Sequence, residues 1–84
     1  MEKTIYIGEV LRKLRKERNF SQEEFAFRAD LNRKFISGLE TGEQQPTYIS
    51  IYKMAKALEI RPSELIKAIE EKMDSDDQYW LQVE

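Results

Sequence analysis

The chain has 84 residues, which allows one domain, and 36% of them are charged. It contains no cysteine and no histidine, which excludes disulfides, thiolate zinc sites and the commonest general base. No apolar run approaches the roughly 18–20 residues of a membrane span, and no signal-peptide pattern opens the chain. We therefore expect a small cytoplasmic protein that is not an enzyme and has no metal, cofactor or membrane partner.

The net charge of −2 hides an uneven distribution of acidic and basic residues. Residues 70–84 contain six acids and one base, a net charge of −5. Residues 1–69 contain 13 bases and 10 acids and so carry +3. The body of the chain therefore has the positive charge that phosphate binding requires, and the acidic sum belongs to the C-terminal tail.

Residues 6–18 are predicted to form an amphipathic helix. Its apolar stripe has i, i+3, i+4, i+7 spacing and consists of Ile7, Val10, Leu11 and Leu14. The basic residues on the rest of this helix are interpreted mainly as a solvated face: Arg12, Lys13, Lys16 and Arg18. Asn19 is expected to end the helix in the left-handed conformation.

A second helix is predicted at residues 22–29. Ser21 and Glu24 have the spacing of a capping box, in which each side chain bonds the other residue's backbone N–H. Phe20 and Phe25 flank this cap at the positions of a hydrophobic staple. The side chains expected to face inward are Phe25, Ala26 and Ala29.

A third short helix is predicted at residues 33–40, after a break at Asp30-Leu31-Asn32. Asn32 is its expected N-cap, and Gly42 follows its end at the position that favours a left-handed residue. Two helices of about two turns joined by a three- or four-residue turn are typical of a helix-turn-helix, here at about residues 21–40. Asp30 stands where this turn often has glycine, and aspartate tolerates positive φ.

Two more helices complete an all-α fold. Thr47 is expected to cap a fourth helix after the polar loop at residues 43–47. Ser63 is the expected cap of a fifth helix that reaches about residue 72. Residues 1–72 are thus predicted to form one domain, followed by an acidic tail at residues 73–84.

Several motifs together resemble the lambda-repressor/Cro-like (XRE) helix-turn-helix family. They are Ser21–Ala26, Ile36–Gly42, Pro46-Thr47 and Met54–Leu58, within a resemblance that runs from about Ile7 to Ile69. The stretch Asp30–Glu40 is also similar to the controller proteins of restriction–modification systems. The resemblance implies a compact five-helix DNA-binding domain, usually a homodimer on a pseudo-palindromic operator.

The resemblance also assigns roles to individual residues. Gln22 matches a position that contacts backbone phosphate and often braces the first base-reading residue. Arg33 and Lys34 match the positions that read base edges. Ser37 and Gly38 match the next outward-facing turn, and Gln44 lies in the loop that usually approaches phosphate in this family. Phe35 is a further candidate for DNA contact. Arg15 and Glu40 match an internal ion pair between the first and third helices.

The residue chemistry agrees with these assignments. Arg33 at a helix start opposes the dipole preference for acids, a cost of some tenths of a kcal/mol that an arriving anion would explain. Arginine suits bidentate contact with guanine, and Gly38 is expected to leave room for close approach. Phe35 is left with two alternatives, packing in the core or touching a thymine methyl group.

The fifth helix and the tail contain more apolar residues than a core of this size needs. The resulting candidates for a homodimer interface are Ile60, Ile66, Ile69, Trp80 and Leu81. In one alternative, Trp80 and Leu81 fold back onto their own domain. In another, Thr4–Ile7 and Tyr79–Val83 pair as a small sheet.

The sequence therefore predicts a sequence-specific regulator of transcription, such as a repressor or a controller protein, that binds double-stranded DNA as a homodimer. The alternative is a protein-interaction module that keeps the fold without binding DNA. The acidic tail, the loop Glu43-Gln44-Gln45 and the net charge favour that alternative. Glu23 beside Glu24 does not indicate acid–base catalysis, because a cap and solvent account for both.

Overall fold

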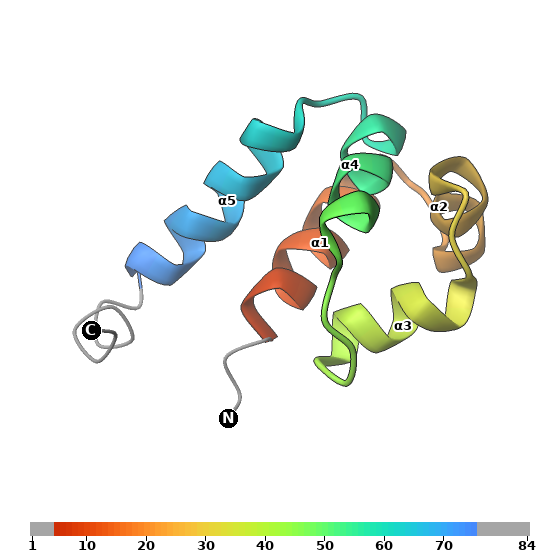
Figure 1. Ribbon diagram of the computed structural model, residues 1–84, viewed down its shortest axis with the longest axis horizontal. Coiled ribbons are helices and arrows are strands. Elements are labelled where there is room, and N and C mark those ends of the chain that lie inside the picture. Colours follow the sequence, from red (N-terminus) through yellow and green to blue (C-terminus); the bar gives the residue numbers. More distant parts are fainter. Residues whose placement is uncertain (1–4, 76–84) are drawn as a thin grey trace.

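The computed structural model describes residues 5–75, which form five α-helices and no strand (Figure 1). These helices are α1 (Ile5–Glu17), α2 (Gln22–Ala29), α3 (Arg33–Thr41), α4 (Tyr48–Ala57) and α5 (Pro62–Ser75). Figure 1 places α1 and α4 in the middle, with α2 and α3 on one side and α5 on the other. The all-α prediction is confirmed, and none of these helices is long and apolar enough to cross a membrane.

One predicted alternative is wrong at its N-terminal strand. Ile5–Ile7 begin α1 and so cannot pair as a β-strand. The other proposed strand, Tyr79–Val83, lies outside the described residues, as do Trp80 and Leu81. The small sheet is therefore excluded at residues 5–7.

Side-chain caps begin three of the helices where the sequence predicts them. Ser21 Oγ accepts from the Glu24 backbone N at 2.9 Å, and Asn32 Oδ1 accepts from the Lys34 backbone N at 2.7 Å. Thr47 Oγ1 accepts from the Ser50 backbone N at 3.0 Å. The helix ends agree as well, because the predicted left-handed residues have positive φ: Asn19 at 61°, Asp30 at 57° and Gly42 at 88°.

Two caps differ from their prediction. The Glu24 carboxylate accepts from Arg28 Nε at 2.6 Å, and the reciprocal capping box occurs instead at the start of α4. Ser63 is not the cap of α5, because the helix already begins at Pro62. Proline suits the first helical position because its missing N–H would have no partner there.

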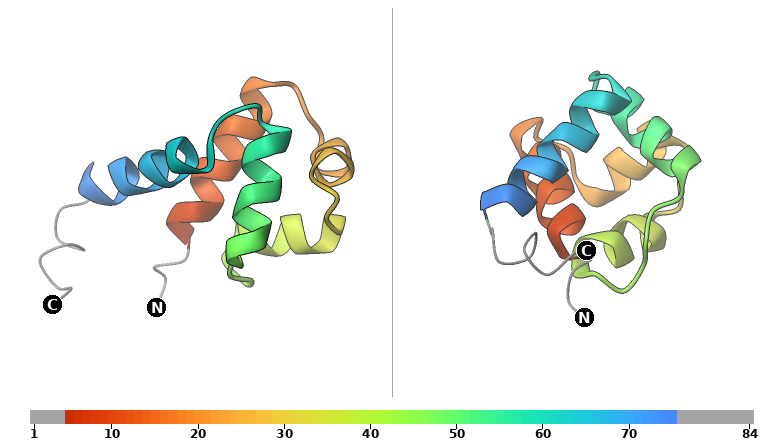
Figure 2. Two further views of the ribbon diagram at one scale, coloured as in Figure 1. Left: turned by 45° about the horizontal axis from the view of Figure 1, so that its top comes forward. Right: turned by 60° about the vertical axis from the view of Figure 1, so that its left-hand side comes forward.

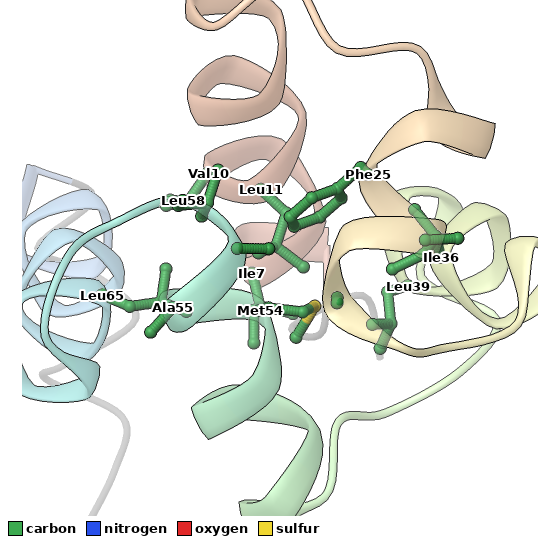
Figure 3. Close-up of a cluster of buried hydrophobic side chains, with 13 residues drawn as sticks. Ile7, Val10, Leu11, Phe25, Ile36, Leu39, Met54, Ala55, Leu58 and Leu65 are labelled. Carbon is green, nitrogen blue, oxygen red and sulfur yellow. The ribbon is translucent and has the colours of Figure 1, made fainter.

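One hydrophobic core receives side chains from all five helices (Figure 3). The largest fully buried side chains are Leu11, Phe25, Ile36, Leu39, Met54, Leu58 and Leu65. Burying one such side chain contributes about 1.5–3 kcal/mol, so these residues dominate the stability of the fold. The predicted staple is also present, since the Phe20 and Phe25 rings stack with centroids 6.5 Å apart.

Two contacts, one within α1 and one just after it, are not evident from local sequence patterns. A Cβ at Gly8 would lie 2.4 Å from the Leu39 carbonyl oxygen, so the glycine allows α1 to cross the end of α3 closely. Arg18 is half-buried and donates from Nε to the Leu58 carbonyl oxygen at 2.9 Å. The interpretation of Arg18 as a solvated side chain is therefore wrong, because it links the turn after α1 to the end of α4.

Candidate nucleic-acid interface

The turn between α2 and α3 sets the direction of α3. Asp30 adopts the left-handed conformation, its backbone N donates to the Phe27 carbonyl, and the Leu31 backbone N donates to the Ala26 carbonyl at 2.9 Å. Leu31 is half-buried against the core and so anchors the turn. Figure 2 shows α2 and α3 together on the side of the molecule away from α5.

The first turn of α3 presents two cations to solvent. Arg33 and Lys34 are both exposed, and the turn contains no acidic residue. The N-terminus of a helix carries positive partial charge, so these side chains add to a field that attracts anions. Gln44 and Gln45 are exposed in the loop after α3.

The next turn of α3 is less accessible. Ser37 is half-buried, and Phe35 is half-buried and packs against the core, which supports the first of its two alternatives. Gly38 is buried, and a Cβ there would lie 2.3 Å from Gln44 Cγ. The expectation that Gly38 leaves room for a ligand is wrong, because the Gln44 side chain occupies that space.

A buried ion pair joins α1 to the last turn of α3. Arg15 and Glu40 are 7% and 9% exposed. Arg15 Nε donates to Glu40 Oε2 at 2.7 Å and Arg15 Nη2 to Glu40 Oε1 at 3.0 Å, a bidentate geometry. Gln22, at the start of α2, donates from Nε2 to Glu40 Oε1 at 3.0 Å.

The sequence reasoning missed one basic residue at the turn. Lys53 of α4 lies with Nζ 3.5 Å from Asp30 Oδ2 and 3.4 Å from the Asp30 carbonyl oxygen. Both side chains are solvent-exposed, so the pair contributes little to stability. It does place a cation of α4 beside the helix-turn-helix, a contact that only the packing of α2 on α4 could reveal.

The exposed apolar residues differ from the predicted interface set. Ile60 and Ile69 are half-buried against the core, whereas Ile66 is 40% exposed. The more exposed side chains on α4 are Tyr48, Ile49 and Tyr52, at 73%, 65% and 49%. The two tyrosine hydroxyls are 3.2 Å apart, and this hydrogen bond raises the pKa of Tyr48 above its usual value.

Comparison with known proteins matches this geometry to a family. The family model for helix-turn-helix proteins matches residues 11–65. The chain belongs to the helix-turn-helix family. A curated relative is the control protein C.MunI of Mycoplasma sp, 40% identical over 67 residues, which are 79% of this chain and 90% of that protein. An uncharacterized HTH-type transcriptional regulator of Sinorhizobium fredii, y4dJ, is 34% identical over 77% of this chain and 84% of its own.

Solved structures of restriction–modification controller proteins share the fold of this helix-turn-helix protein. C.AhdI from Aeromonas hydrophila has 39% sequence identity and a TM-score of 0.71, with 74% of this chain and 94% of that chain covered. C.Esp1396I bound to a 19 base pair DNA duplex has 25% identity and a TM-score of 0.78, with 87% and 97% covered. The relatives with a stated role are regulators and controller proteins, not enzymes.

Proposed function

We propose that this helix-turn-helix protein is a sequence-specific regulator of transcription that binds double-stranded DNA as a homodimer on a pseudo-palindromic operator. The observation that carries the proposal is the exposed pair Arg33 and Lys34 at the start of α3, directly after the turn from α2. The similar controller protein bound to a DNA duplex supports the choice of ligand.

In this proposal, α3 enters the major groove with its N-terminal end. Arg33 makes a bidentate contact with guanine, worth roughly 1–3 kcal/mol of discrimination, and Lys34 and Ser37 lie beside it. Gln22 at the start of α2 and Gln44 in the loop after α3 approach backbone phosphates. Such phosphate contacts supply affinity but no sequence information. Gly38 and Phe35 shape the helix rather than touch the bases, in keeping with their burial.

The homodimer would place two copies of α3 in successive major grooves, about 34 Å apart. The exposed side chains of Tyr48, Ile49 and Tyr52 favour α4 as part of its interface, because contiguous exposed apolar surface marks association sites. Ile66 adds an exposed apolar side chain on α5. Trp80 and Leu81 stay in the proposed interface on the strength of the sequence alone.

The test is selection of bound sequences from a random duplex pool by the purified protein at moderate salt. An inverted repeat with half-sites about one helical turn apart is expected. Enrichment of a single half-site would contradict the homodimer, and enrichment of nothing by folded protein would favour the protein-interaction module instead. The Arg33→Ala/Lys34→Ala double variant, which leaves the buried side chains untouched, is the control for specific recovery.

A further inference from the structure

The Glu40 carboxylate accepts hydrogen bonds from side chains of two other helices. Oε2 accepts from Arg15 Nε at 2.7 Å, and Oε1 accepts from both Arg15 Nη2 and Gln22 Nε2 at 3.0 Å. Arg15 also donates from Nη1 to the Phe20 carbonyl oxygen at 2.7 Å. One buried carboxylate thus connects α1, the start of α2 and the last turn of α3.

This contact fixes which way the Gln22 amide faces. A carboxylate can only accept hydrogen bonds, so the Nε2 end of the amide must point toward Glu40. A phosphate oxygen also only accepts, so it would use the second N–H of the same nitrogen. Gln22 is the first residue of α2, where backbone N–H groups also favour an anion.

Arg15 compensates the negative charge of Glu40 near the start of α2. An unpaired carboxylate near the start of α2 would repel a phosphate, but the bidentate guanidinium neutralises the Glu40 charge. The α1–α3 crossing also holds the end of α3 in place, since a Cβ at Gly8 would lie 2.7 Å from the Glu40 carbonyl oxygen. Glu40 is therefore a rigid and electrically neutralised support.

We propose that Glu40 is a positioning residue, which directs the second N–H of the Gln22 amide toward a DNA phosphate and couples the phosphate contact of α2 to the recognition helix α3. This inference rests on the proposed function, because it assumes that DNA lies against the starts of α2 and α3. Glu40 itself touches no DNA, since it is buried beneath Arg15 and Gln22.

A double-mutant cycle on duplex affinity tests the coupling. Gln22→Ala is made in the natural chain and in an Arg15→Met/Glu40→Leu background, where two apolar side chains replace the ion pair without leaving a buried charge. We expect Gln22→Ala to weaken operator binding about tenfold in the natural chain, and less than about twofold in the background, where the amide is already unsupported.

Lys34→Ala is the matched control, because Lys34 is exposed and its side chain takes no part in the network. It should cause the same loss of affinity in both backgrounds. Equal losses for Gln22→Ala in both backgrounds would overturn the positioning role while leaving the proposed function intact. Failure of the natural protein to bind any duplex would contradict the proposed function itself, and this inference with it.

NMR of the natural protein gives a second test that does not depend on the folding of the variants. The two Gln22 side-chain amide protons are expected to differ, with the one bound to Glu40 protected from exchange and little changed when a duplex is added. The other proton should shift on DNA binding. If both behave like the amide protons of the exposed Gln45, Glu40 does not hold Gln22 and the proposal is wrong.

Discussion

At its start α3 carries two exposed cations, Arg33 and Lys34, whereas at its end Glu40 lies buried against Arg15 and Gln22. Both arrangements oppose the helix dipole, which favours acids at the start of a helix and bases at its end. At the end, the Arg15 guanidinium offsets this cost. At the start, no acidic side chain of residues 7–73 lies within ion-pair distance of Arg33 or Lys34.

Within the nine residues of α3, the end therefore serves the stability of the fold and the start, in the proposed function, serves DNA recognition. The end of α3 is held by α1, α2 and the following loop, so changes there should lower the free energy of unfolding. The start is open to solvent, so changes there should lower the affinity for DNA with little effect on stability.

The largest effect is expected for Glu40→Ala. This change leaves the Arg15 guanidinium buried without its carboxylate, which costs about 3–5 kcal/mol of unfolding free energy. Urea unfolding followed by circular dichroism measures it. Glu24→Ala breaks an exposed pair with Arg28 and should cost less than about 1 kcal/mol, so similar losses for the two variants would refute the structural role of the buried pair.

Gly8→Ala should be the next most damaging change. The new methyl group would lie 2.4 Å from the Leu39 backbone oxygen, so α1 must move away from α3 at a cost of about 1–3 kcal/mol. Gly38→Ala is the matched control, because its methyl would meet the Gln44 side chain, which is exposed and can rotate. Both changes gain the same helix propensity, so a smaller loss for Gly8→Ala would contradict the tight crossing.

Arg33→Ala tests the open end of α3. We expect specific binding to weaken by roughly 1–3 kcal/mol and one operator position to lose its preference. The free energy of unfolding should change by less than about 0.5 kcal/mol, because the side chain is exposed. Competition against operators with single base changes measures the binding affinity and the base preference at each position. Unchanged discrimination at every position would show that Arg33 does not read a base.

Local features of the fold were predictable because their causes lie within a few residues. The caps Ser21, Asn32 and Thr47 and the left-handed Asp30 depend on hydrogen bonds and φ angles inside one turn, and the structure has them. The Ser63 cap failed for a local reason too. Pro62 already suits the first helical position, and the Glu64 side chain accepts from the Arg61 backbone N.

Features that depend on packing between helices were not predictable from patterns. Gly8 and Gly38 have no local signature, since their role comes from α1 against α3 and from the loop against α3. The pattern alone predicts a solvated Arg18, because nothing in the sequence indicates that the Leu58 carbonyl lies near it. For the candidate site, the resemblance assigns Arg33 and Lys34 to the DNA, but the contact of Gln22 with Glu40 depends on how α2 packs against α3 and has no sequence signature.

The smallest expected effect is that of Asn32→Ala, at the boundary between the turn and the open end of α3. Its side chain accepts from the Lys34 backbone N, so the change should lower the free energy of unfolding by about 1 kcal/mol, and Asn32→Gly by only a few tenths. The Arg33 side chain is untouched, so base discrimination should persist in both variants. Loss of discrimination with Asn32→Ala would mean that the cap belongs to the recognition surface, and the division between the two ends of α3 would then have to begin one residue earlier.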